Sequence, residues 1–532
     1  MLQLTLLLVF VSHFVYTFWK IKKDLHILQL NSYFNKRYFA WLREKFVTNF
    51  KVQEFLPLAA MVPLALKASL LAMLVFAGMY IFLFVTRSRY SEKKPLVFTS
   101  RATRVLVVSL LLLVAVYVGS YFEIIIRGES AEYFIILRLA AVAIFSSLLL
   151  SIANLLLLPL EEMIQRWYFN DAAKIMHSLP NLTVVGITGS FGKTTTKHVL
   201  HEILRQKFMT LMTPASFNTT MGVCKTIRLL LKPMHQVFVV EMSAKKPGDI
   251  KELCDLTKPK FGLITAIGEQ HLETFKTFDA IKSTKNELFA ALPSDGVAFF
   301  NFDDESCREL FAKADNCKKI TYGIDSKIVD YRAEQIKIGD DGSSFVVRKM
   351  ASGKMVALQT KLLGKHNVYN ILGAVAIASE MGVDFGDMIY PIRQLRAVQH
   401  RLELKNVSPG ISYIDDSFNS NPVGSRIALE VLAQFASRRK IIVTPGMVEL
   451  GSREEELNRA FGEHIATVCD YVILVGRKQT APIYAGLKSK DYSDSKLYIA
   501  QSFTEANQHL QQILCANDIV LFENDLPDNY NE

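Results

Sequence analysis

A glycine-rich segment between Val184 and Lys197 constrains the fold of this 532-residue chain more than any other feature. It reads V-V-G-I-T-G-S-F-G-K-T-T-T-K, and the apolar stretch Leu182–Ile187 at its start predicts a β-strand. The stretch Thr195–Lys207 predicts an α-helix whose N-terminus faces the loop, where backbone N–H groups attract an anion. A strand, a glycine-rich loop and a helix in this order are typical of a phosphate-binding loop in an α/β fold. The alternative is a glycine-rich turn that binds no ligand.

The side chains of this loop are those that a nucleoside triphosphate and its metal ion require. Lys193 would place a cation on the β- and γ-phosphates, and the Thr194 hydroxyl would ligate Mg²⁺. The other loop residues expected to contact the nucleotide are Gly189, Ser190, Gly192 and Thr195. The segment therefore predicts that the protein binds ATP.

Four apolar runs in the first 170 residues are long enough, or nearly so, to cross a membrane, which takes about 20 apolar residues. They cover Leu2–Trp19, Ala68–Thr86, Val105–Ile126 and Leu139–Leu158. The first run lacks a basic n-region and a small-residue cleavage site, so we interpret it as an uncleaved anchor and not as a signal peptide. We expect three or four spans. The alternative, core helices of a soluble domain, does not suit four such runs in succession.

The excess of positive charge belongs to the same part of the chain. Residues 1–170 hold 18 Lys and Arg against 9 Asp and Glu, whereas the remainder holds 43 against 42. Basic residues between apolar runs suit anionic lipid headgroups. A nucleic-acid-binding protein would carry a basic face on its globular part, so the near-neutral remainder argues against nucleic acid as a partner.

The basic residues conflict with a simple four-span arrangement. With an ATP-dependent body in the cytoplasm, four spans put the N-terminus inside and segment 20–67 outside. The basic residues of that segment include Lys20, Lys22, Lys23, Lys36, Arg37, Arg43 and Lys45. The positive-inside rule places both this segment and the basic loop Arg87–Arg104 in the cytoplasm. A re-entrant or interfacial course for residues 55–86 would resolve the conflict.

The chain becomes a soluble α/β protein after Glu162, where apolar strands alternate with amphipathic helices. Strands at Val237–Val240 and Gly262–Ile267 predict a mostly parallel sheet, with the chemistry at its carboxyl edge. Glu241 directly follows the first of these strands and is placed to complete the Mg²⁺ shell that Thr194 begins. The alternative for Glu241 is a solvated charge at a strand end.

The loop spelling G-I-T-G-S-x-G-K-T-T-T resembles the Mur ligase family, ATP-dependent ligases that build the cell-wall stem peptide. Gly186 and Gly189 match it, and Ile187 stands where the commoner phosphate-binding loop has glycine. The V-E-x-x-x-x-x-P-G-x-I pattern over residues 240–250 is also similar. The resemblance covers roughly residues 175–525 and is nearest to the MurF branch, which adds D-Ala-D-Ala to a UDP-linked tripeptide.

The resemblance implies two Mg²⁺ ions. Glu241 would hold the first with Thr194, and His271 of I-T-A-I-G-E-Q-H-L would bind the second. Lys285 of S-T-K-N-E-L-F, with Glu287 two residues on, resembles the lysine that CO₂ carbamylates in this family, which turns an ammonium into an anion that bridges to metal. Without the resemblance, His271 would be a packing or surface residue and Lys285 a helix-surface residue.

The resemblance also places the nucleotide base. Asn301 and Asp304 match an N-x-D-D turn, and Asn367 and Asn370 match G-x-H-N-x-x-N at the start of a helix. In the family the two amides of that helix help to hold the adenine end of ATP, a role that suits a group with both a donor and an acceptor. The alternative for Asn367 is that it caps the helix.

A second α/β unit, expected to be Rossmann-like, begins near residues 398–402. Arg401 matches a linker arginine that reaches ATP phosphate, and Asp416 matches a position that contacts nucleotide in the family. Asn419 and Asn421 suit a turn and a cap before a helix at Val423–Phe435. Further strands are predicted at Lys440–Thr444, Tyr471–Gly476 and Asp518–Glu523.

Two departures from the MurF pattern bear on the substrate. The N-terminal domain that grips the UDP-sugar in the family is replaced by the apolar region. MurF-type enzymes end their last strand with Lys-Gly-Ser, whereas this chain has Glu523, Asp525 and Asp528. These acids are either a solvated tail or a site that recognises a cationic amino acceptor.

We therefore expect three parts: a membrane region over residues 1–170, a central ATP-binding domain over 171–397 and a C-terminal domain over 398–532. The predicted activity is an ADP-forming amide ligase in the cytoplasmic membrane of a bacterium, multi-pass, with its catalytic domains in the cytoplasm. It would activate a carboxyl group as an acyl phosphate and add an amino acid or dipeptide to a UDP-linked or lipid-linked cell-wall precursor. One alternative is MurF activity on the soluble UDP-linked tripeptide, with the membrane region as a mere anchor. The other is a non-catalytic nucleotide-binding subunit of a membrane complex.

Overall fold

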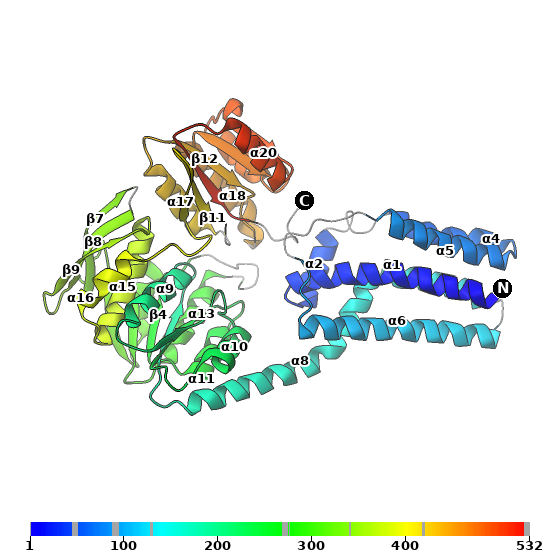
Figure 1. Ribbon diagram of the computed structural model, residues 1–532, viewed down its shortest axis with the longest axis horizontal. Helices are drawn as coiled ribbons and strands as arrows, with labels where there is room; N and C mark the ends of the chain where they lie inside the picture. The colour runs from blue at the N-terminus through cyan, green and yellow to red at the C-terminus, as the bar shows by residue number, and fades with distance from the viewer. Residues whose placement is uncertain are drawn as a thin grey trace. The chain divides into compact units, whose positions relative to one another are not determined.

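The chain divides into two compact units, with the boundary between Gln165 and Arg166. The computed structural model describes residues 2–44, 52–87, 95–127, 131–268, 275, 277–339, 342–417, 421–448 and 450–525. Unit 1, which precedes the boundary, is helical, and unit 2, which follows it, is an α/β structure with two sheets (Figure 1).

Unit 1 is built from helices of very different lengths, the last of which continues across the boundary into unit 2. In order they are α1 (Leu2–Leu30), α2 (Asn35–Glu44), the 3₁₀ helix η1 (Val52–Ala60), α4 (Met61–Ala65), α5 (Ser69–Val85), α6 (Ser100–Arg127), α7 (Glu132–Ile144) and α8 (Ser146–His177). Within the described residues, three helices are long and apolar enough to cross a membrane: α1, α6 and α8. The run predicted at Leu139–Leu158 is not one continuous helix, because the chain breaks at Phe145 (φ −100°, ψ 33°) between α7 and α8.

The segment from η1 to α5 forms a helical hairpin. At its start, Glu54 makes an ion pair with Lys20 of α1 at 2.5 Å. At its end, the guanidinium of Arg87 lies 6.0 Å from the ring centroid of Trp19. Both ends of the hairpin therefore meet the same turn of α1. The apex of the hairpin lies near α7 instead. There the carbonyl of Leu64 accepts a hydrogen bond from the hydroxyl of Tyr133, in the first turn of α7, at 3.0 Å.

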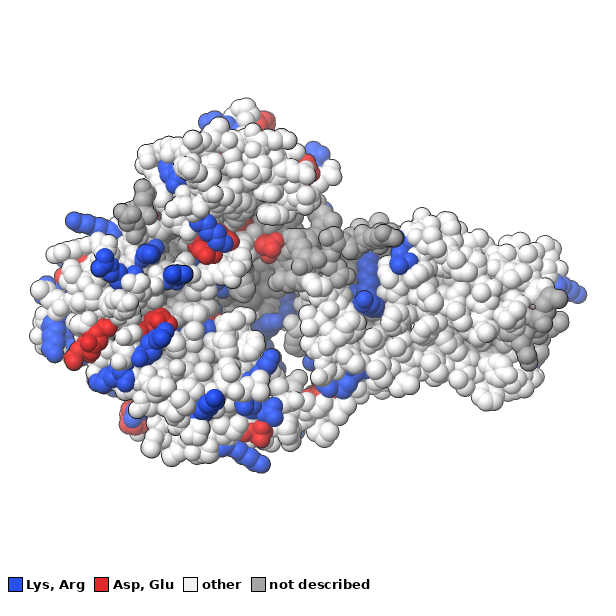
Figure 2. Space-filling view, viewed as in Figure 1, with Lys and Arg blue, Asp and Glu red and all other residues white. Residues whose placement is uncertain are grey.

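The outer surface of unit 1 is apolar. Leu4 is 73% exposed, Leu111 61% and Ile126 80%, although such side chains are ordinarily buried in water-soluble proteins. Figure 2 shows few Lys, Arg, Asp or Glu side chains on the visible face of these helices, whereas unit 2 carries both signs of charge. A continuous apolar surface of this kind suits lipid or a protein partner better than water.

Unit 2 contains a larger sheet whose described strands run in the order β2-β3-β1-β4-β5-β6-β7-β8-β9. The strands are β1 (Thr183–Thr188), β2 (Thr210–Met212), β3 (Val237–Glu241), β4 (Phe261–Ile264), β5 (Val297–Asn301), β6 (Lys318–Gly323), β7 (Tyr331–Gly339), β8 (Gly342–Lys349) and β9 (Met355–Thr360). Strands β2 to β7 pair in parallel, and β7, β8 and β9 add an antiparallel meander at one edge.

Helices cover both faces of this sheet, because successive strand residues point to opposite sides. Val185 and Ile187 of β1 pack in one core with helices α9 (Lys193–Leu204), α15 (Lys365–Glu380) and α16 (Phe385–Arg393). Val184 packs in the opposite core. The helices of that core are α10 (Thr220–Leu230), α11 (Asp249–Thr257), α13 (Phe278–Ala290) and α14 (Glu305–Lys313).

The smaller sheet of unit 2 runs in the order β10-β11-β15-β12-β13-β14 over the described residues. Its strands are β10 (Glu403–Ser408), β11 (Ile411–Asp416), β12 (Arg439–Thr444), β13 (Tyr471–Val475), β14 (Leu497–Ala500) and β15 (Asp518–Glu523). All neighbours pair in parallel except β10 and β11. Helices α17 (Pro422–Ala433), α18 (Glu454–Val468) and α19 (Ala481–Lys488) cover one face, and α20 (Phe503–Ile513) covers the other.

The predicted α/β fold is confirmed, with shifts at the ends of elements. The helix after the glycine-rich loop begins at Lys193, two residues earlier than predicted, because the loop closes directly into its first turn. The strand predicted to reach Ile267 ends at Ile264. Asn421 caps α17 by accepting a hydrogen bond from the backbone N–H of Gly424, as expected, and Asn419 lies outside the described residues.

Candidate active site

The glycine-rich loop lies between β1 and α9, at the carboxyl edge of the larger sheet. Gly189 has φ +144° and Gly192 has φ +80°, a region that side chains rarely allow. A Cβ atom at Gly189 would lie 2.0 Å from the hydroxyl of Thr265, and one at Gly192 would lie 2.4 Å from Oδ1 of Asn370. The loop therefore packs its bare backbone against Thr265, which follows β4, and against Asn370 in the second turn of α15.

Lys193 bends back over this loop. Its Nζ donates to the carbonyl of Gly189 at 2.6 Å and to that of Ser190 at 3.0 Å. Loss of hydration lowers the pKa of Lys193 to about 8, and the carboxylate of Glu241 opposes this only in part. The amine lies where phosphates wrapped by the loop would meet it.

Glu241 is the centre of the hydrogen-bond network. It ends β3, opposite Ile187 of β1, and is only 1% exposed. Its Oε1 accepts from the hydroxyl of Thr194 at 3.1 Å and from the side-chain amide of Asn218 at 3.0 Å. Its Oε2 lies 3.0 Å from the ammonium of Lys197. Burial alone would raise the pKa of Glu241, but the charges of the two nearby lysines outweigh it and the pKa is lowered, so the carboxylate is ionised.

This arrangement fits Mg²⁺. The Thr194 hydroxyl and the Glu241 carboxylate present oxygen atoms 3.1 Å apart beside the phosphate-binding loop, and Mg²⁺ prefers such ligands together with phosphate oxygens. The interpretation of Glu241 as a solvated strand-end charge is wrong, because it is buried and engaged by three side chains. His271 lies outside the described residues. Within the described part of the chain there is no cluster of three His, Cys, Asp or Glu side chains that could hold a metal ion.

Lys285 lies on α13 and is 4% exposed, so it is not a helix-surface residue. Burial and, to a lesser extent, the charge of Lys193 lower the pKa of Lys285 to about 7, which places the two amines within electrostatic reach of each other. Glu287 points elsewhere: its carboxylate accepts hydrogen bonds from the backbone N–H groups of Gly248 and Lys251 at 2.8 and 2.9 Å and so caps the first turn of α11.

A cleft of about 820 Å³ in unit 2 collects most of the candidate residues. Residues from both sheets line it. The candidates along its wall are Ser190, Gly192, Lys193, Thr194, Thr195, Glu241, Asn301, Asn367, Asn370, Arg401 and Asp416. Gly189 and Lys285 are not among the residues that line the cleft. The sequence motifs, although spread over more than 200 residues, therefore converge on one cavity large enough for a nucleotide.

The asparagines of the cleft are hydrogen-bonded to one another and to the backbone. Asn370 donates to Oδ1 of Asn367 at 3.2 Å, and Asn367 donates to the carbonyl of Leu363 at 2.8 Å. The N-cap of α15 is Gly364, so the interpretation of Asn367 as the cap is wrong. Asn301 ends β5 and donates to the carbonyl of Thr265 at 3.3 Å.

The neighbouring residue Asp304 has a structural role. It is the N-cap of α14, and its carboxylate accepts from the backbone N–H groups of Cys307 at 2.8 Å and Ile267 at 3.2 Å. It thereby joins the end of β4 to the start of α14, which keeps the turn after β5 in place.

The smaller sheet supplies Arg401 and Asp416. Asp416 ends β11 and stands in register with Glu523 at the end of β15. Loss of hydration raises the pKa of Asp416 to about 6, although Arg401 and the backbone N–H of Leu402 act in the opposite direction. Glu523 is 1% exposed and hydrogen-bonded to Asp416, so it is not part of a solvated tail. Asp525 is exposed, and Asp528 lies outside the described residues.

Two residues that hold Glu241 were missed by sequence reasoning. Lys197 lies one helical turn after Lys193 and on the same face of α9, a spacing that could have been noticed. Asn218 lies in the loop between β2 and α10, and its motif-free surroundings gave no signal. Both contact the carboxylate of Glu241. The motifs alone did not indicate which residues hold that carboxylate in place.

Alanine at Gly189 should disable the loop. The added Cβ would collide with Thr265 at a backbone angle that costs alanine of the order of 1–3 kcal/mol. We expect Gly189→Ala to weaken ATP binding at least tenfold in isothermal titration calorimetry. Gly386→Ala is the matched control, because a Cβ there meets nothing within 4 Å. Equal ATP affinity in both variants would contradict the close packing of this loop.

The Asp416–Glu523 pair should make stability fall as pH rises. The folded-state pKa of Asp416 is raised from 3.8 to about 6, so the folded protein holds a proton that the unfolded chain releases between these values. The contribution is present below about pH 4 and is lost as pH rises through 6, by about 1–3 kcal/mol. We expect Asp416→Asn to flatten the decline of melting temperature between pH 4.5 and 7 relative to wild type. Asp525→Asn, an exposed control, should leave the decline unchanged, and a flat wild-type profile would contradict the prediction.

Comparisons with known proteins agree with this geometry. Residues 187–378 match the Mur ligase middle domain, and residues 400–523 match the Mur ligase glutamate ligase domain. The UDP-N-acetylmuramoyl-tripeptide–D-alanyl-D-alanine ligase of Haemophilus influenzae is 30% identical over 329 residues, 61% of this chain and 70% of that enzyme. The enzyme of the same name from Bacillus subtilis is 30% identical over 284 residues, 53% of this chain and 60% of that enzyme, so the chain spans less than two thirds of this relative.

A solved structure shows the same fold. The MurF ligase from Thermotoga maritima in complex with ADP superposes with a TM-score of 0.60 at 25% identity, over 68% of this chain and 80% of that chain. The matches begin at the glycine-rich loop and extend through the last strand of the smaller sheet. The chain belongs to the Mur ligase family.

Proposed function

We propose that the protein is an ATP-dependent ligase of the MurF type, which joins D-alanyl-D-alanine to the terminal carboxyl group of a UDP-linked muramoyl tripeptide. These substrates are the ones named for its relatives from Bacillus subtilis and Haemophilus influenzae. The observation that carries the proposal is the contact of Thr194 and Lys197 with the buried carboxylate of Glu241 at the phosphate-binding loop. A nucleotide site of this kind, facing a second α/β domain across one cleft, suits the joining of two substrates.

The reaction would proceed in two steps. A carboxylate oxygen of the tripeptide attacks the γ-phosphorus of ATP, the bond from that phosphorus to ADP breaks, and an acyl phosphate forms. The amine of the dipeptide then attacks the acyl carbon, phosphate leaves, and the amine gives up a proton as the amide forms. The main barrier to the first step is the approach of two anions, so positioning and charge stabilisation are the enzyme's contribution.

The residues of the cleft divide this task. Lys193 and Arg401, which both line the cavity, would neutralise the phosphates. Lys197 holds Glu241 in place, so that its other oxygen stays aimed at Thr194. Thr194 and Glu241 would hold Mg²⁺, which neutralises charge on the β- and γ-phosphates when bound. Asn301, Asn367 and Asn370 would face the base.

Lys285 would act in a modified form. Its pKa of about 7 leaves much of the buried amine neutral at physiological pH, and the neutral amine is the form that adds to CO₂. The nitrogen bonds to the carbon of CO₂ and loses one proton, which gives a carbamate anion. That anion would supply an oxygen ligand for a second Mg²⁺, with His271 as its proposed neighbour.

We also propose the division into a membrane region over residues 1–170, an ATP-binding domain over 171–397 and a C-terminal domain over 398–532. In the membrane region, the hairpin from η1 to α5 would enter and leave on one side, because both its ends meet Trp19 and Lys20. Helix α6 returns antiparallel to α1, since Gln29 contacts Val97 and His13 contacts Tyr117. Three crossings, by α1, by α6 and by α7 with α8, would then follow.

This topology would remove the conflict over charge. The described parts of the two basic segments, residues 20–44 and 95–104, would both fall on the side where the α/β body begins, which is the cytoplasm if ATP is to reach the site. The basic residues of both segments then obey the positive-inside rule. The N-terminus would face the opposite side of a bacterial cytoplasmic membrane.

A lipid-linked acceptor is the second candidate substrate. Unit 1 favours this candidate, because a unit with an apolar surface occupies the part of the chain where the family has its UDP-sugar-binding domain. The test compares kcat/KM of full-length protein in detergent for the UDP-linked and the lipid-linked tripeptide. We expect the UDP-linked form to be used at least as well. A preference of more than tenfold for the lipid-linked form would overturn the first proposal and support the second.

Removing the loop lysine should abolish turnover. Lys193→Ala deletes the cation expected on the phosphates, and we expect phosphate release in the presence of both substrates to fall at least 1,000-fold, as losses of this type of group allow. Lys313→Ala, an exposed lysine on α14, is the matched control and should retain full activity. Near wild-type turnover by Lys193→Ala would exclude this cleft as the catalytic site.

Carbamylation of Lys285 should be visible directly. We expect protein incubated with ¹³C-labelled bicarbonate to show a carbamate carbon signal that disappears in Lys285→Arg. Activity should fall when CO₂ is removed from the buffer and return when it is restored. A labelled signal that persists in Lys285→Arg would place the modification on another lysine.

A further inference from the structure

The short segment that carries Arg401 has an unusual backbone. His400 has φ +62° and Leu402 has φ +46°, so both neighbours of Arg401 lie in the left-handed region. Residues with a Cβ atom rarely adopt this conformation, and a branched residue such as leucine does so least readily. A backbone of this kind persists only where surrounding contacts hold it in place.

The contacts that hold it come from the two acids at the end of β11. Oδ2 of Asp415 lies 2.9 Å from Nδ1 of His400, and Oδ1 of Asp416 accepts a hydrogen bond from the backbone N–H of Leu402 at 3.1 Å. One acid therefore holds the residue before Arg401, and the other holds the residue after it. Because the two acids are consecutive residues of a paired strand, the sheet fixes the distance between these two contacts.

Asp415 is itself anchored. Its Oδ2 accepts from the ammonium of Lys405 at 2.7 Å, and its Oδ1 accepts from the hydroxyl of Ser417 at 2.7 Å. Partial burial alone would raise the pKa of Asp415, but the hydrogen bonds from its partners outweigh burial and the pKa is lowered, so the carboxylate is ionised. An ionised and anchored acid is a firm attachment point for the imidazole of His400.

Arg401 itself lies at the cleft. It is half-buried and lines the cleft together with Lys193 and Asp416. Burial lowers the pKa of Arg401, and the charges of Asp416 and Glu241 act in the opposite direction, so the guanidinium lies within electrostatic reach of the phosphate-binding loop. A long side chain whose backbone is fixed on both sides loses less conformational freedom when it binds a ligand.

We propose that Asp415 is a positioning residue for nucleotide binding, which acts through His400 to fix the direction in which Arg401 meets the phosphates. This inference rests on the proposed role of Arg401 and goes beyond it, because Asp415 is not among the residues that line the cleft. Asp415 therefore contributes to nucleotide affinity without touching the nucleotide.

A double-mutant cycle on nucleotide affinity tests this role. The probe is the Mg²⁺ complex of AMP-PNP, an ATP analogue that resists hydrolysis, titrated calorimetrically into full-length protein in detergent. We expect Asp415→Ala to weaken binding about tenfold in the wild-type background and less than about twofold in the Arg401→Ala background, where no guanidinium remains to be positioned. Arg401→Ala keeps the glycine-rich loop and Lys193, so binding stays measurable. Equal losses in the two backgrounds would overturn the proposal.

A second variant tests the same contact from its other side. His400→Ala removes the imidazole that Asp415 holds, so we expect the same loss of about tenfold, and the double variant Asp415→Ala/His400→Ala should be no worse than either single variant. A further loss in the double variant, or unchanged affinity in His400→Ala, would overturn the proposed route through His400.

Asp470→Ala is the matched control. Asp470 also pairs with a lysine, Lys440, and accepts a backbone hydrogen bond, but it does so at the opposite edge of the same sheet. Its replacement should leave AMP-PNP affinity within about twofold of wild type, and an equal loss there would show that any weakening of this sheet lowers affinity. Amide formation is measured separately. Its absence with the expected cycle intact would contradict the ligase proposal alone, whereas additive losses in an active ligase would contradict this inference alone.

Discussion

The ionised carboxylate of Glu241 is the interaction on which the site depends. Burying a carboxylate is unfavourable unless charges and hydrogen bonds compensate it. Here the compensation comes from Lys197, Thr194 and Asn218, which lie on α9 and in the loop before α10. The same contacts therefore stabilise the negative charge, join β3 to the phosphate-binding loop, and aim two oxygen ligands at one point. Loss of any partner would disturb packing and ligand geometry together.

Local motifs predicted the core of this arrangement, and long-range packing determined the rest. The glycine-rich loop is contiguous, so its strand, turn and helix followed from spacing alone. Lys197 and Asn218 were missed because their importance lies in reaching Glu241, a contact that only the folded sheet creates. The capping alternative for Asn367 is wrong because α15 begins at Lys365, after Gly364, so that Asn367 already lies inside its first turn. His271 stays a prediction.

Unit 1 shows a different limit of sequence reasoning. Hydropathy measures length and apolarity, and by both measures Ala68–Thr86 resembles a span. What distinguishes it is that the preceding segment, with Pro57 in a 3₁₀ helix and the short helix α4, lies against it and brings its two ends together. The periodicity of apolar residues in the sequence does not show that the chain folds back in this way. The basic residues carried the information instead, since the positive-inside rule placed segment 20–67 and loop 87–104 on the same side.

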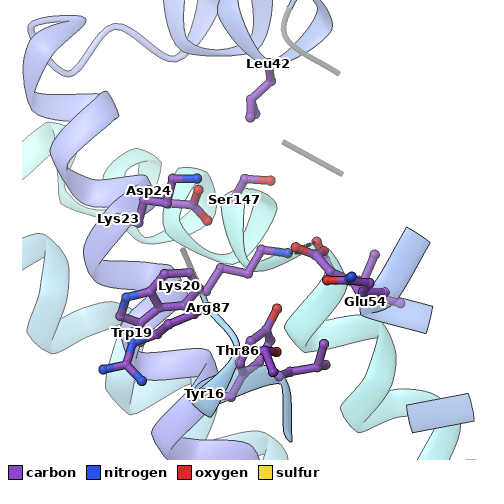
Figure 3. A pocket seen from close by; sticks show the side chains of 13 residues that line it. Tyr16, Trp19, Lys20, Lys23, Asp24, Leu42, Glu54, Thr86, Arg87 and Ser147 are labelled. Atoms are coloured by element: carbon purple, nitrogen blue, oxygen red, sulfur yellow. Dashed lines mark hydrogen bonds and ion pairs between the residues drawn. The ribbon is translucent and has the colours of Figure 1, made fainter. Parts of the chain in front are cut away.

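The ion pair between Lys20 and Glu54 in unit 1 is difficult to explain as a contribution to the free energy of folding. Replacing a buried pair by apolar side chains of similar size is often neutral or stabilising, because desolvation of both charges offsets their attraction. Lys20 and Glu54 stand in a region where apolar residues are abundant, so a simpler packing solution was available. The Glu132 carboxylate and the pairing of Arg138 with Glu123 lie among the same helices, at the end remote from Lys20 and Glu54. The Lys20–Glu54 pair borders a cavity in unit 1 that Tyr16 and Trp19 also line (Figure 3), and its contact joins η1 to α1.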